Sequence, residues 1–271
     1  MIRLTAYAKV NLFLEITGRR ADGYHTLSTV FQTISLGDEL SFAPAKDFSM
    51  TCSDPTLPVD ERNLVMRAAL RLRDALREER GAKIHLDKKV PRGAGLGGGS
   101  ADAAATIKGL LQLWGRRLGG SAIRRLAVTL GADVPFFLKG GLCSATGIGD
   151  RLKALKPFPK TWIVLVWPGF GVSTREAYAK VRLPFADPPL RRSADPRRTL
   201  FNRFESLVFP DHPELLRLKD ALLEAGATGA LMSGSGSSVF GLAASRAQGL
   251  KILQRVQSQY PDSWLAHTLS V

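Results

Sequence analysis

The chain has 271 residues, of which 45% are hydrophobic and 23% are charged, and its mean hydropathy is -0.01. This composition excludes a disordered polar chain, and the absence of any apolar run of roughly 18 residues excludes a membrane-spanning protein. The formal net charge of +14 fits a protein that binds nucleic acid or anionic metabolites, but the basic residues are scattered and no nucleic-acid motif accompanies them.

The first part of the chain is predicted to be rich in strands. Alternating apolar and polar side chains predict strands over residues 2–17 and 26–42. Apolar residues four positions apart then predict a helix over residues 63–80, and renewed alternation predicts a strand over residues 83–90. The opening residues lack the pattern of a signal or transit peptide, so we expect a cytoplasmic protein that begins at Met1.

Helices and strands follow each other through the rest of the chain. Helices are predicted over residues 100–113, 121–130 and 214–225, and strands over residues 162–167 and 239–242. The strand at 162–167 is a continuous apolar run, which indicates a central place in a sheet. The Pro- and Arg-rich stretch 184–198 is predicted to be mobile, and a change of composition at 153–160 marks the expected domain boundary.

A glycine-rich segment, PRGAGLGGGSADAAA (residues 91–105), leads into the Ala-rich helix. Its backbone N–H groups can converge on an anion, and the helix dipole adds about half a positive charge there, which predicts a phosphate site. The segment is not a P-loop, because it lacks the Lys-Ser/Thr pair. Gly93, Gly95 and Gly98 match GxGxxG, but no Asp or Glu occurs between Ala103 and Ala132 to bind a ribose, which argues against a dinucleotide fold.

Three polar residues near helix starts have two interpretations each. Asp102 either complements the helix dipole or binds Mg²⁺ beside phosphates, and we favour the dipole. Ser100 is either an N-cap or a ligand of Mg²⁺ or of phosphate oxygens, with no preference between them. Asn63 is either the N-cap of the helix that follows it or a contact of a nucleotide base.

The cysteines point to no chemistry of their own. Cys52 and Cys143 are too few for a disulfide framework or a metal cluster. No catalytic Cys/His pattern surrounds them, so we interpret both as reduced thiols.

Four segments of the chain occur in a recognisable order: AYAKVNLFLEITGRRADGYH, the glycine-rich segment, LGADVPFFLKG and MSGSGSSVF. In this combination the chain resembles the GHMP kinases over nearly its whole length. The motifs KxNLxL, RxDGYH, GVST and NRFE are similar to the branch of that family that acts on a cytidine diphosphate-linked methylerythritol.

The resemblance implies an α+β fold with two lobes. The N-terminal lobe, expected over residues 1–152, is similar to domain 2 of ribosomal protein S5, and the C-terminal lobe, expected over residues 153–271, is ferredoxin-like. In this arrangement the last strand of the chain can pack on the N-terminal lobe, so the boundary between the lobes is approximate. The resemblance also implies a small-molecule substrate, no nucleic acid, no membrane, and a monomer or weak homodimer.

The implied reaction transfers the γ-phosphoryl group of ATP, with Mg²⁺, to the 2-hydroxyl of 4-diphosphocytidyl-2-C-methyl-D-erythritol in non-mevalonate isoprenoid biosynthesis. Such transfers pass through a loose transition state, so the protein mainly positions the reactants and balances charge. The residues implied to bind ATP are Pro91, Arg92, Gly93, Ala94, Gly95, Leu96, Gly97, Gly98, Gly99, Ser100 and Ala101.

Two residues are implied to be catalytic. Asp133 matches the family's acid that accepts the hydroxyl proton, and the alternative is an ordinary turn or capping aspartate. Lys9 matches the lysine that contacts this aspartate and the reacting hydroxyl. Asn11, on the same strand face as Lys9, is implied to hydrogen-bond the substrate, and the alternative is a solvent-facing strand position.

The pyrimidine of the substrate needs an aromatic contact. Tyr24 and His25 match the pair that the family uses for cytosine, by stacking and hydrogen bonding. A second aromatic residue should cover the other face of the base. Tyr178 or Phe185 could supply it, and this assignment stays open.

A second glycine loop, which contains Gly234, Ser235 and Gly236, follows in MSGSGSSVF. It is predicted to approach the diphosphate or to shape the cleft, and the alternative is a plain turn before a strand.

Two other functions remain as alternatives: a GHMP kinase for a different small alcohol, and a basic RNA-binding protein. The DGYH loop argues against the first, and the lack of an RNA-binding motif argues against the second.

Overall fold

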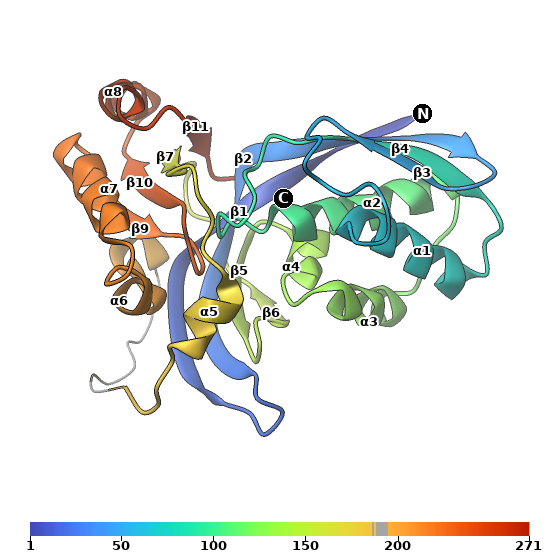
Figure 1. Ribbon diagram of the computed structural model, residues 1–271, viewed down its shortest axis with the longest axis horizontal. Coiled ribbons are helices and arrows are strands. Elements are labelled where there is room, and N and C mark those ends of the chain that lie inside the picture. Colours follow the sequence, from blue (N-terminus) through green and yellow to red (C-terminus); the bar gives the residue numbers. More distant parts are fainter. Residues whose placement is uncertain (186, 188–194, 271) are drawn as a thin grey trace. The chain divides into compact units, whose positions relative to one another are not determined.

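The computed structural model of the chain describes residues 1–185, 187 and 195–270 (Figure 1). The chain divides into two units, which are described one at a time. Unit one comprises residues 1–8, 37–90 and 97–139, and unit two comprises residues 9–36, 91–96 and 140–271. Of the segment predicted to be mobile, residues 186 and 188–194 lie outside the described residues. The domain boundary expected between residues 152 and 153 stays a prediction.

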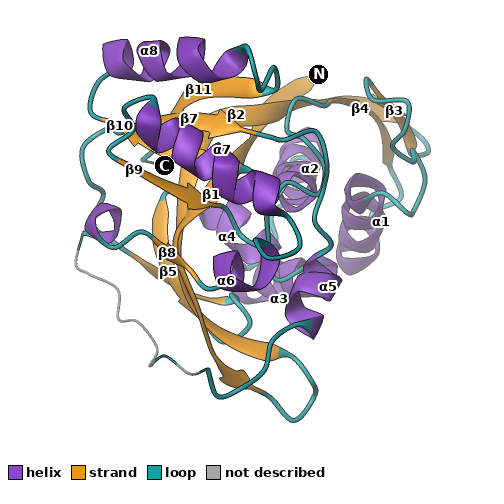
Figure 2. Cartoon of the chain, turned by 60° about the vertical axis from the view of Figure 1, so that its left-hand side comes forward, coloured by secondary structure: helices purple, strands orange, loops and turns teal. Residues whose placement is uncertain are grey.

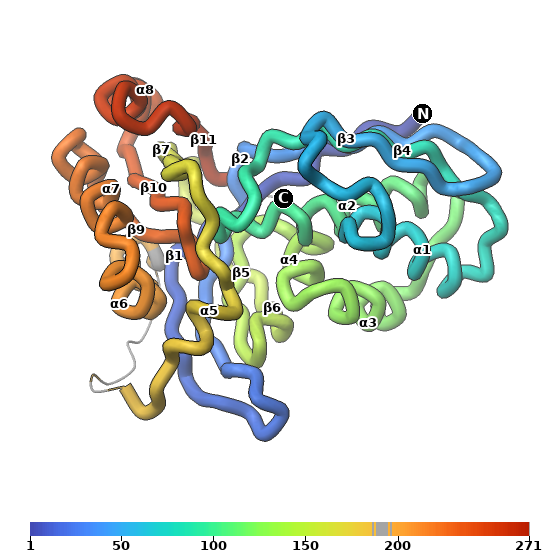
Figure 3. The backbone as a smooth tube through the Cα atoms, in the orientation of Figure 1, coloured from blue at the N-terminus to red at the C-terminus, as the bar shows by residue number. Residues whose placement is uncertain are grey.

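Two long strands supply residues to both units, and Figure 3 traces them in blue. β1 (Ile2–Arg19) belongs to unit one up to Ala8 and to unit two from Lys9 onward. β2 (His25–Ala45) belongs to unit two up to Leu36 and to unit one thereafter. The two strands predicted at the start of the chain are confirmed, and both are longer than their alternation indicated.

The sheet of unit one is built around β4 (Gly81–Asp87). This strand pairs antiparallel with the unit-one part of β2 and parallel with β3 (Ser49–Cys52). The strand predicted over residues 83–90 ends early, because the N–H groups of Lys89 and Val90 donate to the Asp38 carboxylate, at 2.6 and 2.8 Å, rather than to a neighbouring strand. A side chain therefore ends this strand and starts the turn that leads to the glycine-rich segment.

Four helices of unit one pack against one another. They are α1 (Leu64–Leu76), α2 (Gly98–Trp114), α3 (Gly120–Leu130) and α4 (Val134–Lys139). A Cβ atom on Gly109 would lie 2.4 Å from the ring of Phe42, so only glycine lets α2 lie this close to β2. The helices predicted over residues 63–80, 100–113 and 121–130 are confirmed.

A four-stranded antiparallel sheet forms the centre of unit two. Its order is β11–β7–β10–β9, so β7 has a neighbour on each side, as its apolar run predicted. The helices α7 and α8 pack on this sheet (Figure 2), and the core between them includes Val164, Leu218 and Ile252. The bounds are β7 (Trp162–Val166), α7 (Pro213–Glu224), β9 (Gly229–Met232), β10 (Val239–Ala243), α8 (Arg246–Gln257) and β11 (Ser263–His267).

Shorter elements complete unit two. β8 runs parallel to β1, with Phe13 opposite Phe201, and β5 pairs with both β2 and β6. Their bounds are β5 (Leu142–Thr146), β6 (Arg151–Ala154), α5 (Thr174–Ala179), the 3₁₀ turn η1 (Pro196–Arg198), β8 (Phe201–Asn202) and α6 (Phe204–Val208). Within the described ranges, no helix has both the length and the apolar character to cross a bilayer.

Candidate active site

Lys9 lies on β1 in unit two, and its residue is only 3% exposed. Its Nζ donates to Asn11 Oδ1 at 2.6 Å and to the backbone oxygen of Gly95 at 2.7 Å. The same ammonium lies 5.5 Å from the centroid of the Phe31 ring, within the range of a cation–π contact. The Lys9 side chain is therefore buried and held against Gly95 of the glycine-rich segment.

Asn11 is 1% exposed, so the solvent-facing alternative for this residue is wrong. While Oδ1 accepts from Lys9, Nδ2 donates to Thr29 Oγ1 at 2.8 Å. Thr29 in turn donates to the backbone oxygen of Phe13 at 2.7 Å. This relay fixes which end of the Asn11 amide faces the ammonium. The part of Thr29 in it was not predicted, because no local pattern marks that residue.

The two predicted glycine loops meet within unit two. Gly95 has φ +73°, and a Cβ atom there would lie 1.9 Å from the backbone oxygen of Ser233, so glycine is required on both counts. Ser233 Oγ donates to Gly95 O at 3.0 Å, and Ser238 N donates to Ala94 O at 3.1 Å. Residues 233–238 therefore hold the backbone of the glycine-rich segment at Ala94 and Gly95.

The second loop carries the predicted residues Gly234, Ser235 and Gly236. Both glycines have positive φ, +59° and +89°, and a Cβ atom on Gly234 would lie 3.4 Å from Lys9 Nζ. The Ser235 hydroxyl shares a hydrogen bond of 2.9 Å with Thr174, at the start of α5. The structure thus brings this loop to Lys9, whereas its contact with substrate stays a prediction.

The predicted ATP-binding segment is shared by the two units: residues 91–96 belong to unit two and residues 97–101 to unit one. Helix α2 begins at Gly98, with Gly97 as its N-cap at φ +70°. The interpretation of Ser100 as N-cap is therefore wrong, because the left-handed Gly97 lets the helix start earlier and places Ser100 inside the first turn. Ser100 Oγ would lie 3.7 Å from a Cβ atom on Gly131, two residues before Asp133.

Asp102 is not a residue of the first helical turn, so its preferred interpretation as a complement to the dipole is wrong. The side chain is buried beside Lys88, whose Nζ contacts Asp102 Oδ2 at 3.1 Å and also pairs with Asp38. Burial raises the pKa of Asp102 to about 8; the charge of Lys88 opposes this rise and that of Asp38 adds to it. Burial would lower the pKa of Lys88, but the two carboxylates outweigh it and raise that pKa.

Asp133 directly precedes α4, after α3 has ended at Leu130. Its backbone oxygen accepts from Phe136 N at 3.0 Å, so the residue opens the helix. The side chain is half-buried. Asp133 thus occupies the junction that the motif LGADVPFFLKG predicted, and its catalytic role stays a prediction.

Asn63 is the N-cap of α1. Its Oδ1 accepts from Val65 N at 3.0 Å, and its Nδ2 donates to Pro58 O at 2.8 Å. The capping interpretation is confirmed, while a contact with a nucleotide base stays a prediction.

The aromatic residues proposed for the pyrimidine lie in unit two, and two of them, Tyr24 and His25, lie where β2 begins. Tyr24 is 63% exposed, whereas His25 stacks on Tyr178 with ring centroids 5.2 Å apart. Burial, and then the charge of Arg19, lower the pKa of His25, so the imidazole is neutral at pH 7. The other candidate, Phe185, has its ring centroid 4.6 Å from the Arg203 guanidinium.

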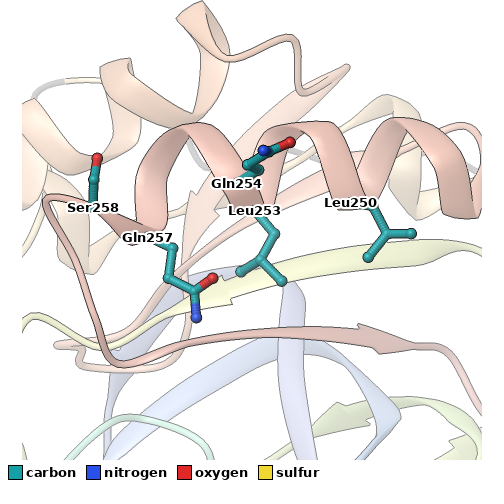
Figure 4. A pocket seen from close by; sticks show the side chains of 5 residues that line it. All are labelled: Leu250, Leu253, Gln254, Gln257 and Ser258. Carbon is teal, nitrogen blue, oxygen red and sulfur yellow. The ribbon is translucent and has the colours of Figure 1, made fainter.

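A shallow hollow along α8 is lined by Leu250, Leu253, Gln254, Gln257 and Ser258 (Figure 4). None of these side chains ionises near neutral pH, and none is a predicted site residue. The hollow is therefore not a candidate active site.

Comparison with known families agrees with this geometry. The model of the "GHMP kinases N terminal domain" matches residues 63–141, and that of the "GHMP kinases C terminal" matches residues 189–262. These matches define the class of the protein, and the predicted α+β fold of a two-domain GHMP kinase is confirmed.

Individual relatives narrow the class. A 4-diphosphocytidyl-2-C-methyl-D-erythritol kinase from Prosthecochloris aestuarii is 42% identical, over 96% of this chain and 95% of its own. One from Symbiobacterium thermophilum is 40% identical, over 99% of this chain and 100% of its own. The crystal structure of a 4-(cytidine 5'-diphospho)-2C-methyl-D-erythritol kinase matches with a TM-score of 0.87 and 35% identity, over 100% of both chains.

A more distant structure shares the fold alone. Homoserine kinase from Cytophaga hutchinsonii matches with a TM-score of 0.74 and 24% identity, over 99% of this chain and 94% of its own. The chain belongs to the GHMP kinases, within the family of 4-diphosphocytidyl-2-C-methyl-D-erythritol kinases.

Proposed function

We propose that this chain uses ATP to phosphorylate the 2-hydroxyl of 4-diphosphocytidyl-2-C-methyl-D-erythritol, which yields the 2-phosphate and ADP in isoprenoid biosynthesis. The observation that carries the proposal is the buried Lys9 ammonium, hydrogen-bonded to Asn11 and to Gly95 O of the glycine loop. A positive charge at such a loop suits phosphoryl transfer, and the family membership supplies the acceptor.

The chemistry follows from the charges that change. Asp133 accepts the proton of the substrate hydroxyl as its oxygen attacks the γ-phosphorus of ATP. Lys9 balances the negative charge that develops on the reacting oxygens, and backbone N–H groups of residues 91–101 bind the phosphates. Asn11 orients the acceptor beside Lys9, since the relay through Thr29 fixes its amide.

We propose that Mg²⁺ accompanies ATP. Such an ion usually binds through substrate phosphates and water with only one or two protein ligands. Among residues 1–185, 187 and 195–270, no group of three or more His, Cys, Asp or Glu side chains could hold a metal. Asp102 does not fit as a ligand, because its side chain is buried against Lys88 and its pKa is raised to about 8, which keeps the carboxyl protonated at neutral pH. Ser100, in the first turn of α2, remains the candidate.

The cytosine would be recognised where β2 begins. The exposed Tyr24 ring offers a stacking surface, and a neutral His25 can both donate and accept a hydrogen bond. Tyr178 already stacks on His25, which supports it over Phe185 as the second aromatic residue. We further propose that the protein is a monomer or weak homodimer. We also propose that it lies in the cytoplasm, a location that suits its two soluble anionic substrates.

The test is ADP release with Mg²⁺ and a panel of alcohols: the cytidylyl methylerythritol, homoserine and mevalonate. We expect turnover with the first alone. Asp133→Asn and Lys9→Ala should each lower kcat by a factor of about 10² or more, because they act on the reacting atoms. Matched controls are Asp60→Asn and Lys251→Ala, at exposed positions, which should keep full activity. Turnover of homoserine or mevalonate instead, or near-normal kcat in either catalytic variant, would overturn the proposal.

A further inference from the structure

The segment Asn202–Glu205, which reads NRFE and is called the NRFE segment below, has no part in the chemistry proposed above. Its first two residues are nevertheless polar and buried, Asn202 at 2% and Arg203 at 6% exposure. Burying an amide and a guanidinium is unfavourable unless every polar group finds a partner. Their partners show what the segment does.

The Asn202 amide binds the second glycine loop. Its Nδ2 donates to Met232 O and to Gly234 O, both at 2.7 Å, while Oδ1 accepts from Phe204 N at 3.0 Å. Both N–H donors and the carbonyl are thus used. The two acceptors belong to the residues before and after Ser233, so one side chain holds both neighbours of that serine.

Glu205 strengthens the same attachment. Its Oε1 accepts from Met232 N at 2.9 Å, and its Oε2 accepts from Lys219 Nζ at 2.6 Å. Met232 is therefore fixed through both its N–H and its carbonyl by side chains of the NRFE segment.

Arg203 attaches the segment to β1, the strand of Lys9. Its guanidinium forms a bidentate salt bridge with Glu15, in which each of the two hydrogen bonds is 2.8 Å long. Its backbone N donates to Leu14 O at 2.9 Å. The pair is buried, with Glu15 fully enclosed. A bidentate salt bridge fixes the relative orientation of the two side chains as well as the distance between them.

These contacts converge on Lys9. Ser233 Oγ accepts from Asn11 N at 3.3 Å and donates to Gly95 O at 3.0 Å, and Gly95 O is also the acceptor of Lys9 Nζ. We infer that Asn202 is a positioning residue for Lys9. Asn202 acts on Lys9 indirectly, through Ser233 and the carbonyl of Gly95. The inference deepens the proposed function and rests on it for the catalytic readout.

Asparagine suits this position for a specific reason. Both Met232 O and Gly234 O need a donor, and an aspartate of the same shape offers only acceptors. Asn202→Asp would therefore place a carboxylate against two carbonyl oxygens, whereas Asn202→Ala would leave both oxygens buried without a partner. In either variant Ser233 loses the Asn202 contacts to both of its neighbours, and we expect the Gly95 carbonyl to turn from Lys9.

The first measurement is a double-mutant cycle with Lys9, using the full chain well below its melting temperature. We expect Asn202→Ala to lower kcat about 10-fold or more, with the KM for ATP within about 2-fold of the wild type. In the Lys9→Ala background the same change should alter kcat by less than about 2-fold, because the group it positions is gone. The control is Leu218→Ala, a core variant of unit two that should lower Tm but not kcat.

The second measurement does not depend on the substrate. Lysine ¹⁵N labelling reports the Lys9 ammonium by NMR, with Lys9→Ala to assign its signal. We expect Asn202→Ala to shift or broaden that signal and Leu218→Ala to leave it unchanged. The inference would be overturned if Asn202→Ala left the Lys9 signal unmoved. It would also be overturned if Asn202→Ala lowered kcat by the same factor in the wild-type and Lys9→Ala backgrounds. A moved signal in a protein inactive on the cytidylyl substrate would instead sink the proposed function alone.

Discussion

Asp102, Lys88 and Asp38 form a buried group of two carboxyls and one ammonium in unit one. A Cβ atom on Gly98, the first residue of α2, would lie 2.9 Å from Lys88 Nζ, so the group lies directly beneath the start of that helix. Two ionised carboxylates there would leave a net negative charge where phosphates are expected to bind. Because its pKa is raised to about 8, Asp102 stays protonated at neutral pH and the group is electrically neutral.

The raised pKa of Asp102 predicts how stability depends on pH. An unfolded aspartate ionises near 3.8, but this one keeps its proton to about 8 in the folded chain. Between these values unfolding releases a proton, so its contribution to stability falls as pH rises, by up to about 1.4 kcal/mol per pH unit. Urea unfolding from about pH 5 to about pH 8 should show a smaller decline for Asp102→Asn than for the wild type.

The control for this experiment is Asp60→Asn. The side-chain hydrogen bond of Arg62 lowers the pKa of Asp60 to about 2, so this carboxyl does not titrate in the same window. The pH dependence of Asp60→Asn should therefore parallel that of the wild type. Identical slopes for wild type and Asp102→Asn would show that Asp102 is ionised in the folded protein.

Among the secondary-structure elements, α1 depends on its N-cap, Asn63, which directly precedes its first residue. Asn63→Ala should lower the free energy of unfolding by about 1 kcal/mol or more, because the variant loses the cap on Val65 N and the bond to Pro58 O. Urea denaturation measures the loss. Asn63→Asp, which keeps the capping oxygen, should lose less, and equal stability of all three proteins would contradict the prediction.

The same variants address the open role of Asn63. An unchanged KM for ATP in Asn63→Ala would assign the residue to capping alone. A several-fold rise in that KM, beyond any loss of folded protein, would support contact with the nucleotide base.

Long periodic elements were predictable, and short ones were not. The two long strands, helix α2 and central strand β7 follow from alternation, helical spacing and an apolar run. Strands such as β8, with only Phe201–Asn202, are too short to show a period, and β8 exists because it pairs with β1. The start of α2 was misplaced because a left-handed glycine, Gly97, caps it without a side chain.

Site residues were likewise predictable where the local sequence marks them, and not where their partners lie far away in the chain. Lys9 and Asn11 stood out because a charge and an amide interrupt an apolar strand, and the structure joins them by a hydrogen bond. Lys88 and Asp38 were missed, since residues 50 apart give no local sign of a pair. Ser233 and Asn202 lay in quoted motifs, but their partners are set by tertiary contacts that no local pattern encodes.

At the scale of the whole molecule, the formal charge of +14 should act on encounter rates. Both proposed substrates are anions, so their attraction weakens as salt shortens the screening length. We expect kcat/KM for each to fall several-fold between about 0.02 M and about 0.3 M ionic strength, with kcat almost constant.

This experiment needs free Mg²⁺ held constant, and a sucrose series separates viscosity from screening. Salt-independent kcat/KM would mean that the positive charges do not attract substrate. Tight binding of a labelled RNA with a steep salt slope would point to the nucleic-acid alternative instead.

The chain passes back and forth between its two units at Ala8, Leu36, Val90, Leu96 and Lys139. During translation, every residue of unit one has been synthesised once Lys139 is added, whereas residues 9–36 of unit two still await the whole of 140–271. The strand that carries Lys9 is thus among the first parts made and among the last to acquire its neighbours, because Asn202 and Ser233 come so much later. A nascent chain of this design lacks these contacts around Lys9 until Asn202 and Ser233 have been synthesised.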